Sequence, residues 1–242
     1  MKKILIAVCI LVSATQSMAQ GRIYATLDDV YRDFMVQSHS QFNKVVLNDF
    51  MGVGGDKRFM SNNWLVGGAT NNFNVTISGN YFFNYDFLGQ ELHAKWKDTT
   101  IIVNTNYVKR FFLQDATGIH YFVKSQAIDP PGKFFFESIG FDESRSDSLP
   151  TVQLLKLRTV KKVKANKDEY LANFSGDYSD KLDNDITYYI QLPDNTFTKV
   201  KMNSKSIQAA LSGYSKKVSD YISKNPVRDD YSAAGLIQYL NQ

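Results

Sequence analysis

Five short runs of aromatic and β-branched residues follow one another between Asn80 and Val123, and this stretch constrains the fold more than any other part of the chain. Strands of about five residues joined by connections of about two to five residues are typical of an antiparallel β-meander. A parallel return would need a crossover of about a dozen residues. We therefore expect antiparallel strands here. The predicted strands are Tyr81–Asp86, Glu91–Trp96, Thr100–Val103, Tyr107–Leu113 and Ile119–Val123.

More strand candidates lie on both sides of this stretch. Lys133–Ile139 contains three consecutive phenylalanines, and we expect a strand that is buried on both faces. Pro193, Asp194 and Asn195 form a turn between two strand-like runs, which predicts a hairpin. Gly68–Asn72 is predicted to be a break between strands. The remaining predicted strands are Lys44–Leu47, Trp64–Gly67, Phe73–Ile77, Val152–Val160, Ile186–Gln191 and Thr196–Lys201.

The first nineteen residues have the pattern of a bacterial-type secretory signal peptide. Two lysines precede an apolar run, Ile4–Val12, that is too short to span a bilayer. Ser17 and Ala19 then provide the small residues of a cleavage site. We expect the mature chain to begin at Gln20 and to be exported to the periplasm, to the outer membrane or out of the cell.

Cleavage at this site would also remove Cys9, the single cysteine of the chain. The mature protein would then have no disulfide and no thiolate for catalysis or metal binding. The formal net charge of +4 would fall by two with the loss of the leader lysines, so there is no electrostatic case for a nucleic-acid partner. No later apolar stretch is long enough to predict a membrane span. We expect neither a cofactor nor a metal.

The C-terminal part is predicted to be helical, because apolar residues recur at helical spacing in Val218–Ile222 and Leu236–Leu240. Asp229 or Asp230 is a suitable cap for the last helix. The predicted fold class is mainly β (α+β): an antiparallel meander, a sandwich or a partly closed barrel, with a short helical C-terminal tail.

The sequence predicts four parts. They are the signal peptide (1–19), an N-terminal extension with a short helix ending near His39 (20–63), an antiparallel β body (64–203) and a helical tail packed on that body (204–242). A polar segment at 142–150 leaves open a division of the β body into two sub-sheets.

The order of these elements resembles a group of uncharacterised secreted β-rich proteins of Bacteroidota-type bacteria. The resemblance covers roughly Tyr81–Asn241 and consists of hydrophobic patterns. It implies a β-rich body, a helical tail and export, and it implies no activity. The segments that carry it are Tyr121–Val123, Gly132–Glu137, Leu154–Lys156, Ile186–Ile190, Phe197–Lys201, Val218–Lys224 and Leu236–Asn241.

Histidines and carboxylates are the candidate catalytic side chains. His93 and His120 lie in predicted strands and could meet across the sheet with a carboxylate such as Glu91. No H-E-x-x-H, H-x-H or G-x-S-x-G motif accompanies them. Glu91, Glu137 and Glu143 could supply a glycosidase carboxylate pair, but any β protein of this size offers such pairs. The site residues are therefore not determined by the sequence.

Three polar segments resemble ligand sites but lack the required pattern. Gly52–Lys57 does not have the spacing of a phosphate-binding loop. The aspartates of Asp177–Asp185 lack the glycine and the distal glutamate of an EF-hand, so a polar loop is favoured over a calcium site. The basic segment Lys156–Lys167 is interpreted as a lysine-rich sheet edge rather than as a patch for an anionic ligand.

Two classes of function remain. We favour a non-enzymatic binding or structural module of the cell envelope, whose partner is a protein, a glycan or a lipid. The alternative is a hydrolase whose site is assembled from distant residues such as carboxylates and His93 or His120. A cleft with two carboxylates or a histidine with a perturbed pKa would favour the hydrolase. An exposed aromatic or apolar patch would favour the binding module.

Overall fold

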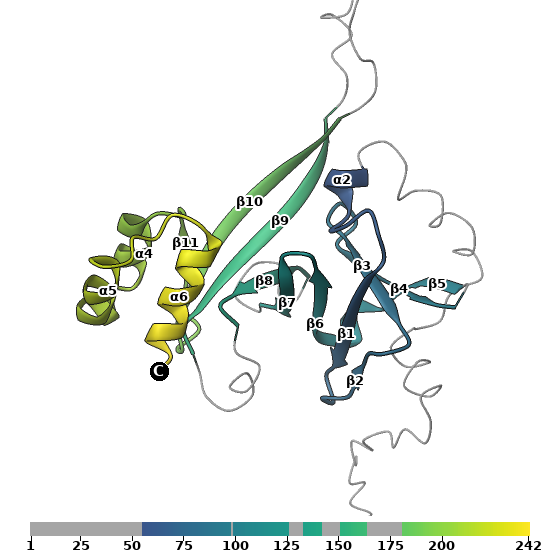
Figure 1. Cartoon of the computed structure of the whole chain (residues 1–242), viewed down its shortest axis with the longest axis horizontal. Coiled ribbons are helices and arrows are strands. Elements are labelled where there is room, and N and C mark those ends of the chain that lie inside the picture. Colours follow the sequence, from purple (N-terminus) through teal and green to yellow (C-terminus); the bar gives the residue numbers. More distant parts are fainter. Residues whose placement is uncertain (1–54, 98, 126–132, 142–150, 164–180) are drawn as a thin grey trace, which may run out of the picture.

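The computed structural model describes residues 55–97, 99–125, 133–141, 151–163 and 181–242 of the chain (Figure 1). The strands form one open antiparallel sheet, and three short helices follow near the C-terminus. The mainly β fold class with a helical tail is therefore confirmed. The signal peptide, the helix predicted to end near His39 and the strand predicted at Lys44–Leu47 lie outside the described residues.

The elements are named in chain order. The strands are β1 (Leu65–Asn71), β2 (Thr76–Ile77), β3 (Phe82–Asp86), β4 (Glu91–Trp96), β5 (Thr99–Ile102), β6 (Val108–Asp115), β7 (Gly118–Lys124), β8 (Phe135–Ile139), β9 (Gln153–Val163), β10 (Lys181–Gln191) and β11 (Phe197–Val200). The helices are α2 (Gly55–Arg58), α4 (Ser204–Ala210), α5 (Ser215–Ile222) and α6 (Asp230–Leu240), with two 3₁₀ turns, η2 (Thr105–Tyr107) and η4 (Ser212–Tyr214).

The sheet consists of two meanders joined through β1. Strands β6 to β11 pair in chain order, and so do β3 to β5, while β1 lies between β6 and β3. The expectation that all five runs of Asn80–Val123 pair in sequence is therefore wrong at one place: β5 and β6 are not neighbours. β1 is the partner of both β3 and β6. The pairing continues from β8 to β9, the strands on either side of residues 142–150.

β1 extends beyond the predicted strand Trp64–Gly67, because Gly68 and the three residues after it lie in the strand and not in a break. A Cβ on Gly67 would lie 2.5 Å from the carbonyl oxygen of Phe112, and a Cβ on Gly68 would lie 2.7 Å from the Phe112 ring. Phe112 is directly opposite Gly68 on β6. The absence of side chains thus lets the ring lie over the neighbouring strand, which is a known role for glycine within sheets.

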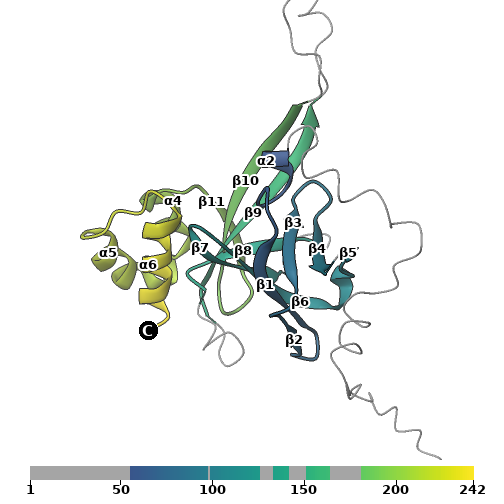
Figure 2. The ribbon, with the colours of Figure 1, turned by 45° about the vertical axis from the view of Figure 1, so that its right-hand side comes forward.

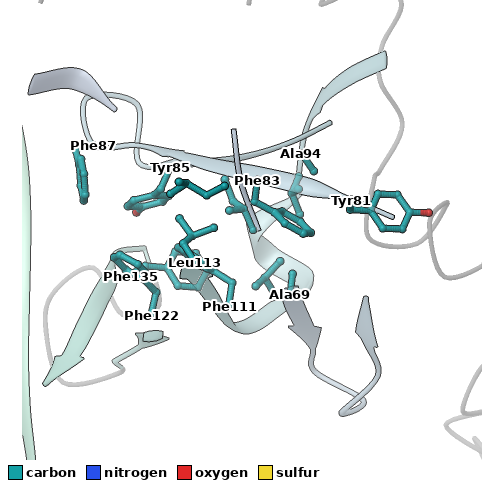
Figure 3. Packing of buried hydrophobic residues seen from close by; sticks show 14 of the residues in the cluster. Ala69, Tyr81, Phe83, Tyr85, Phe87, Ala94, Phe111, Leu113, Phe122 and Phe135 are labelled. Atoms are coloured by element: carbon teal, nitrogen blue, oxygen red, sulfur yellow. The ribbon is translucent and has the colours of Figure 1, made fainter. Parts of the chain in front are cut away.

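Aromatic side chains from β3, β6, β7 and β8 form the first hydrophobic cluster (Figure 3). Tyr85 is fully buried, and its ring centroid lies 5.1 Å from that of Phe111 and 5.5 Å from that of Phe122. Phe111 and Phe122 are cross-strand partners whose rings stack 4.6 Å apart. Phe135 of β8 completes the group. Such aromatic pairs contribute about 0.5–1.5 kcal/mol each beyond their burial.

The helical tail packs on the other end of the same sheet. Helices α4, α5 and α6 lie together beside β9, β10 and β11 (Figure 1, Figure 2). The second hydrophobic cluster joins Leu154 of β9 and Ile190 of β10 to Leu236 and Ile237 of α6. Asp229 caps α6 by accepting the backbone N–H of Ser232.

Strand β10 begins earlier than predicted. It starts at Lys181 instead of Ile186 and pairs with β9 along its whole length. Asp183 and Asp185 therefore lie in a strand and not in a polar loop, while residues 177–180 lie outside the described part of the chain. Separately, none of the described helices combines the length and apolar character needed to cross a membrane.

Candidate functional site

A row of charged and polar side chains crosses the sheet face that carries both hydrophobic clusters. We call it the charged row, and its members are Asp115, His120, Glu137, Lys156, Tyr188 and Asp230. Glu137 of β8, Lys156 of β9 and Tyr188 of β10 lie directly opposite one another in the register. Their side chains therefore project from the same face. On β8, the row is flanked by Phe135 of the first cluster and Ile139 of the second. The row thus separates the two clusters.

One end of the row lies at the β6–β7 turn. His120 of β7 is two residues from Phe122, the cross-strand partner of Glu137, so it shares the face of Glu137. Its Nδ1 lies 2.7 Å from Glu137 Oε1, and its Nε2 lies 3.1 Å from Asp115 Oδ1. His120 is therefore held between two carboxylates that come from different strands.

The other end reaches the first turn of α6. Glu137 Oε2 lies 3.2 Å from Lys156 Nζ. The same ammonium group donates to Asp230 Oδ2 at 2.6 Å, and the hydroxyl of Tyr188 donates to Asp230 Oδ1 at 2.9 Å. Lys156 is therefore shared between a carboxylate of the sheet and a carboxylate of the helix.

These contacts shift the pKa values of the titrating groups at the turn end. The hydrogen bond to Glu137 has the largest influence on His120 and outweighs burial, so the pKa of His120 lies above its usual value. Burial by itself would raise the pKa of Glu137, but the hydrogen bond from His120 and the charge of Lys156 lower it. The imidazole therefore holds its proton more tightly than a free histidine does.

The same balance applies at the helix end. Burial disfavours the charged form of Lys156, but the carboxylates of Glu137 and Asp230 outweigh it and raise the pKa of Lys156. Burial and then the hydrogen bond to Asp230 raise the pKa of Tyr188 to about 12. Each charge in this part of the row faces an opposite charge or a hydrogen-bond donor.

A hydroxyl group adjoins the row at the β6–β7 turn. Thr117 Oγ1 lies 2.9 Å from His120 Nε2, while Nδ1 of the same ring contacts Glu137. Hydroxyl, imidazole and carboxylate in this order are the components of a hydrolytic triad. However, Thr117 Oγ1 also donates to Asp115 Oδ1 at 2.6 Å. A hydroxyl that donates its proton to Asp115 does not donate it to His120, so this geometry favours a turn-stabilising role.

The two histidines named by the sequence do not come together. His93 lies on β4 and His120 on β7, and three strands of the sheet lie between them. His93 Nε2 is 3.3 Å from Glu91, the carboxylate expected to accompany it. His93 Nδ1 is buried and has no hydrogen-bond partner among the described residues. Glu143, the third glutamate considered, lies outside those residues.

Asp86, Glu91 and His93 bring three potential metal ligands close together. Both oxygens of Asp86 are already engaged, because Arg58 donates to Oδ2 at 2.8 and 2.9 Å and two backbone N–H groups of the next turn donate to Oδ1. A metal ion would have to displace a guanidinium group from a fully buried carboxylate. The cluster is therefore better explained as a salt bridge that holds Arg58 beside β3.

The described part of the basic segment makes internal contacts. Lys156 belongs to the charged row, and the Arg158 guanidinium lies 4.3 Å from the centroid of the Phe87 ring. Lys161 lies 4.0 Å from Asp185 on the neighbouring strand. The sheet-edge interpretation is wrong for Lys156, because β9 is an interior strand that pairs there with both β8 and β10. The contacts of Lys156 and Arg158 within the protein also give no support to a patch for an anionic ligand. Lys164 and Lys167 lie outside the described residues.

The opposite face of the sheet carries exposed apolar side chains. Phe82 of β3, Val66 of β1, Gln114 of β6 and Ile119 of β7 lie opposite one another in successive strands. Val66, Phe82 and Ile119 are 53%, 45% and 49% exposed, and we call these three residues the exposed apolar row.

Two half-buried aromatic rings adjoin this row. Phe112 and Tyr121 follow Gln114 and Ile119 at a spacing of two residues on the same strands, so they share that face. Their ring centroids lie 6.0 Å apart, and Tyr121 also lies 4.5 Å from Phe141. The apolar surface therefore continues beyond the exposed row.

The sequence indicates His120 and Glu137 as candidate site residues but does not connect them with Lys156 and Asp230. One feature of the sequence does indicate a buried ion pair. Glu137 is a single charge in the middle of a strand predicted to be buried, and such a charge needs a partner. The exposed apolar row gave a weaker signal, because its members come from three separate strands and align only once the register is known.

Comparison with known proteins identifies no relative: no family model, curated protein or solved structure matches the chain.

Proposed function

We propose that this chain is an exported protein of the bacterial cell envelope that acts as a non-enzymatic binding module and binds a protein partner through the exposed apolar row. The observation that carries the proposal is the alignment of Val66, Phe82 and Ile119, each about half exposed, on the face opposite both hydrophobic clusters. Exposed apolar side chains that gather on one face commonly mark an interaction site, and in this row Gln114 is the single polar member between Val66 and Ile119.

The composition of the row favours a protein over a glycan. Sugar rings stack on flat aromatic faces, whereas Val66 and Ile119 are aliphatic. The adjoining rings of Phe112 and Tyr121 add the aromatic character that is enriched at protein interfaces.

The proposal that the protein is exported rests on the Ile4–Val12 run and the cleavage pattern that follows it. To test export, the intact mass of the protein is measured in an envelope fraction. We expect the mass of a chain that begins at Gln20.

The binding surface is tested with the mature protein carrying a photo-crosslinking residue at position 114, which lies within the row. We expect a defined protein adduct in the native envelope. The partner is then purified, and its Kd is measured with the wild type and with the V66T/F82T/I119T variant. Threonine is β-branched and suits an exposed strand position, so the melting temperature should change little. The Kd should rise by about tenfold or more, which is the consequence of losing about 1.4 kcal/mol of binding free energy.

Tyr231→Ser is the matched control, because Tyr231 is 90% exposed and lies on α6, away from the row. It should leave the Kd unchanged. Equal effects of both variants, or adducts only with lipid or glycan, would contradict a protein partner at this face.

The alternative function, a hydrolase, is favoured by the hydroxyl–imidazole–carboxylate arrangement of Thr117, His120 and Glu137. Asp115 argues against it, because it takes the proton of the Thr117 hydroxyl. Hydrolysis of a panel of chromogenic esters and glycosides by the wild type and by Thr117→Val distinguishes the two functions. Turnover that falls at least about a hundredfold in the variant would support the hydrolase. Equal background rates would exclude this triad.

A further inference from the structure

The charged row is a continuous chain of hydrogen bonds and ion pairs that runs from the β6–β7 turn to the first turn of α6. It contains five acidic or basic side chains from five elements: Asp115 of β6, His120 of β7, Glu137 of β8, Lys156 of β9 and Asp230 of α6. Tyr188 of β10 donates its hydroxyl to the last of them.

The balance of charge within the row depends on His120. With His120 protonated, Glu137 contacts two cations, because His120 lies on one of its oxygens and Lys156 on the other. With His120 neutral, Lys156 is the single cation that faces both Glu137 and Asp230. The ammonium group must then be shared between two unbalanced carboxylates.

We propose that this row is a pH-dependent clasp that holds the first turn of α6 against the sheet, with His120 as its titrating member. When His120 loses its proton, Glu137 attracts Lys156 more strongly and the contact between Lys156 and Asp230 weakens. The N-terminal turn of α6 then opens more often, while the apolar residues further along the helix stay packed in the second cluster. This inference does not depend on the proposed binding function.

The pH window follows from the direction of each shift. The pKa of His120 is raised, so its contribution is fully present below its usual value of 6.5 and is lost as the pH rises through the folded-state pKa. The pKa values of Asp115 and Glu137 are lowered, so their contributions are fully present above the usual values of 3.8 and 4.5 and are lost on further acidification. The clasp is therefore closed between about pH 4.5 and 6.5 and loosens on both sides of this range.

Hydrogen exchange of the mature protein tests the clasp directly. Exchange of the amides of α6 is measured at pH 5.5 and 8.5 and corrected for the intrinsic rate. We expect opening of the first turn to increase with pH, by up to about tenfold for each unit by which the pKa of His120 is raised. In His120→Gln this dependence should disappear. The amides of α5 are the internal control, because none of the residues of the charged row belongs to this helix.

Tyr188→Phe provides the matched variant. It removes a hydrogen bond to Asp230 and leaves the titrating residues in place, so opening should increase at both pH values while the pH dependence remains. The same pH dependence in His120→Gln as in the wild type would overturn the proposal. If His120→Gln does not fold, the NMR titration of the His120 ring in the wild type decides instead, because a pKa at or below about 6.5 would also overturn it.

Discussion

Gly67 shows how strongly a single residue can depend on its neighbours in this sheet. A Cβ at this position would lie 2.5 Å from a backbone oxygen, which cannot move without shifting β6. We expect Gly67→Ala to lower the free energy of unfolding by about 1–3 kcal/mol, the range for overpacking a well-packed interior. Urea denaturation measures the change. Gly213→Ala is the control, because nothing lies within 4 Å of its Cβ position, and an equal loss in both variants would contradict the packing argument.

The sequence predicts little of the charged row at the level of single residues. Glu137 could be recognised as a charge inside an apolar strand, but nothing in the sequence indicates that Lys156 is its partner. The two residues become neighbours through the register of β8 and β9, and a shift of one residue would place them on opposite faces. Asp230 is 74 residues from Lys156 in the chain, and their contact depends on how α6 packs on the sheet.

The sequence predicts the positions of the strands far better than it predicts which strands pair with one another. Most strands begin and end within about two residues of the predicted limits, because alternation and turn residues are local signals. The position of β1 between β3 and β6 depends on long-range packing instead. Gly68, which contributes to this close packing, is also the residue at which a break is predicted, because glycine favours both situations.

The contact between α5 and α6 gives a prediction at the scale of elements. A Cβ on Gly235 of α6 would lie 2.3 Å from the hydroxyl oxygen of Tyr221 of α5. Gly235→Ala should therefore destabilise the wild type, although alanine is the better helix former by about 1 kcal/mol. In a Tyr221→Phe background the clash with the hydroxyl is removed, and the same substitution should become neutral or stabilising.

Thermal denaturation of the four proteins in this cycle measures the coupling between the two positions. Additive effects of the two substitutions would mean that the helices are spaced more widely than the structure indicates.

For the whole molecule, the main physical question is whether two hydrophobic clusters on one sheet unfold together. β8 and β9 contribute to both, because Phe135 and Val160 belong to the first cluster while Ile139 and Leu154 belong to the second. A strand cannot easily keep its pairing in one half while losing it in the other. The charged row between the clusters adds contacts that require both halves to be folded.

Removal of residues 204–242 tests this coupling. The truncation exposes Leu154 and Ile190 and leaves Lys156 without Asp230. Burial of each Leu or Ile side chain contributes about 1.5–3 kcal/mol, so the loss of several of them is comparable with the usual net stability of a domain, about 5–15 kcal/mol. We expect the truncated protein to lose cooperative unfolding even when it is followed by tryptophan fluorescence in a Trp64→Phe background, which reports on Trp96 beside the first cluster. Deletion of Gln242 alone, an exposed residue, is the control. A truncated chain that keeps a cooperative transition of Trp96 at an unchanged urea midpoint would show that the first cluster folds independently and that the helical tail is an accessory to it.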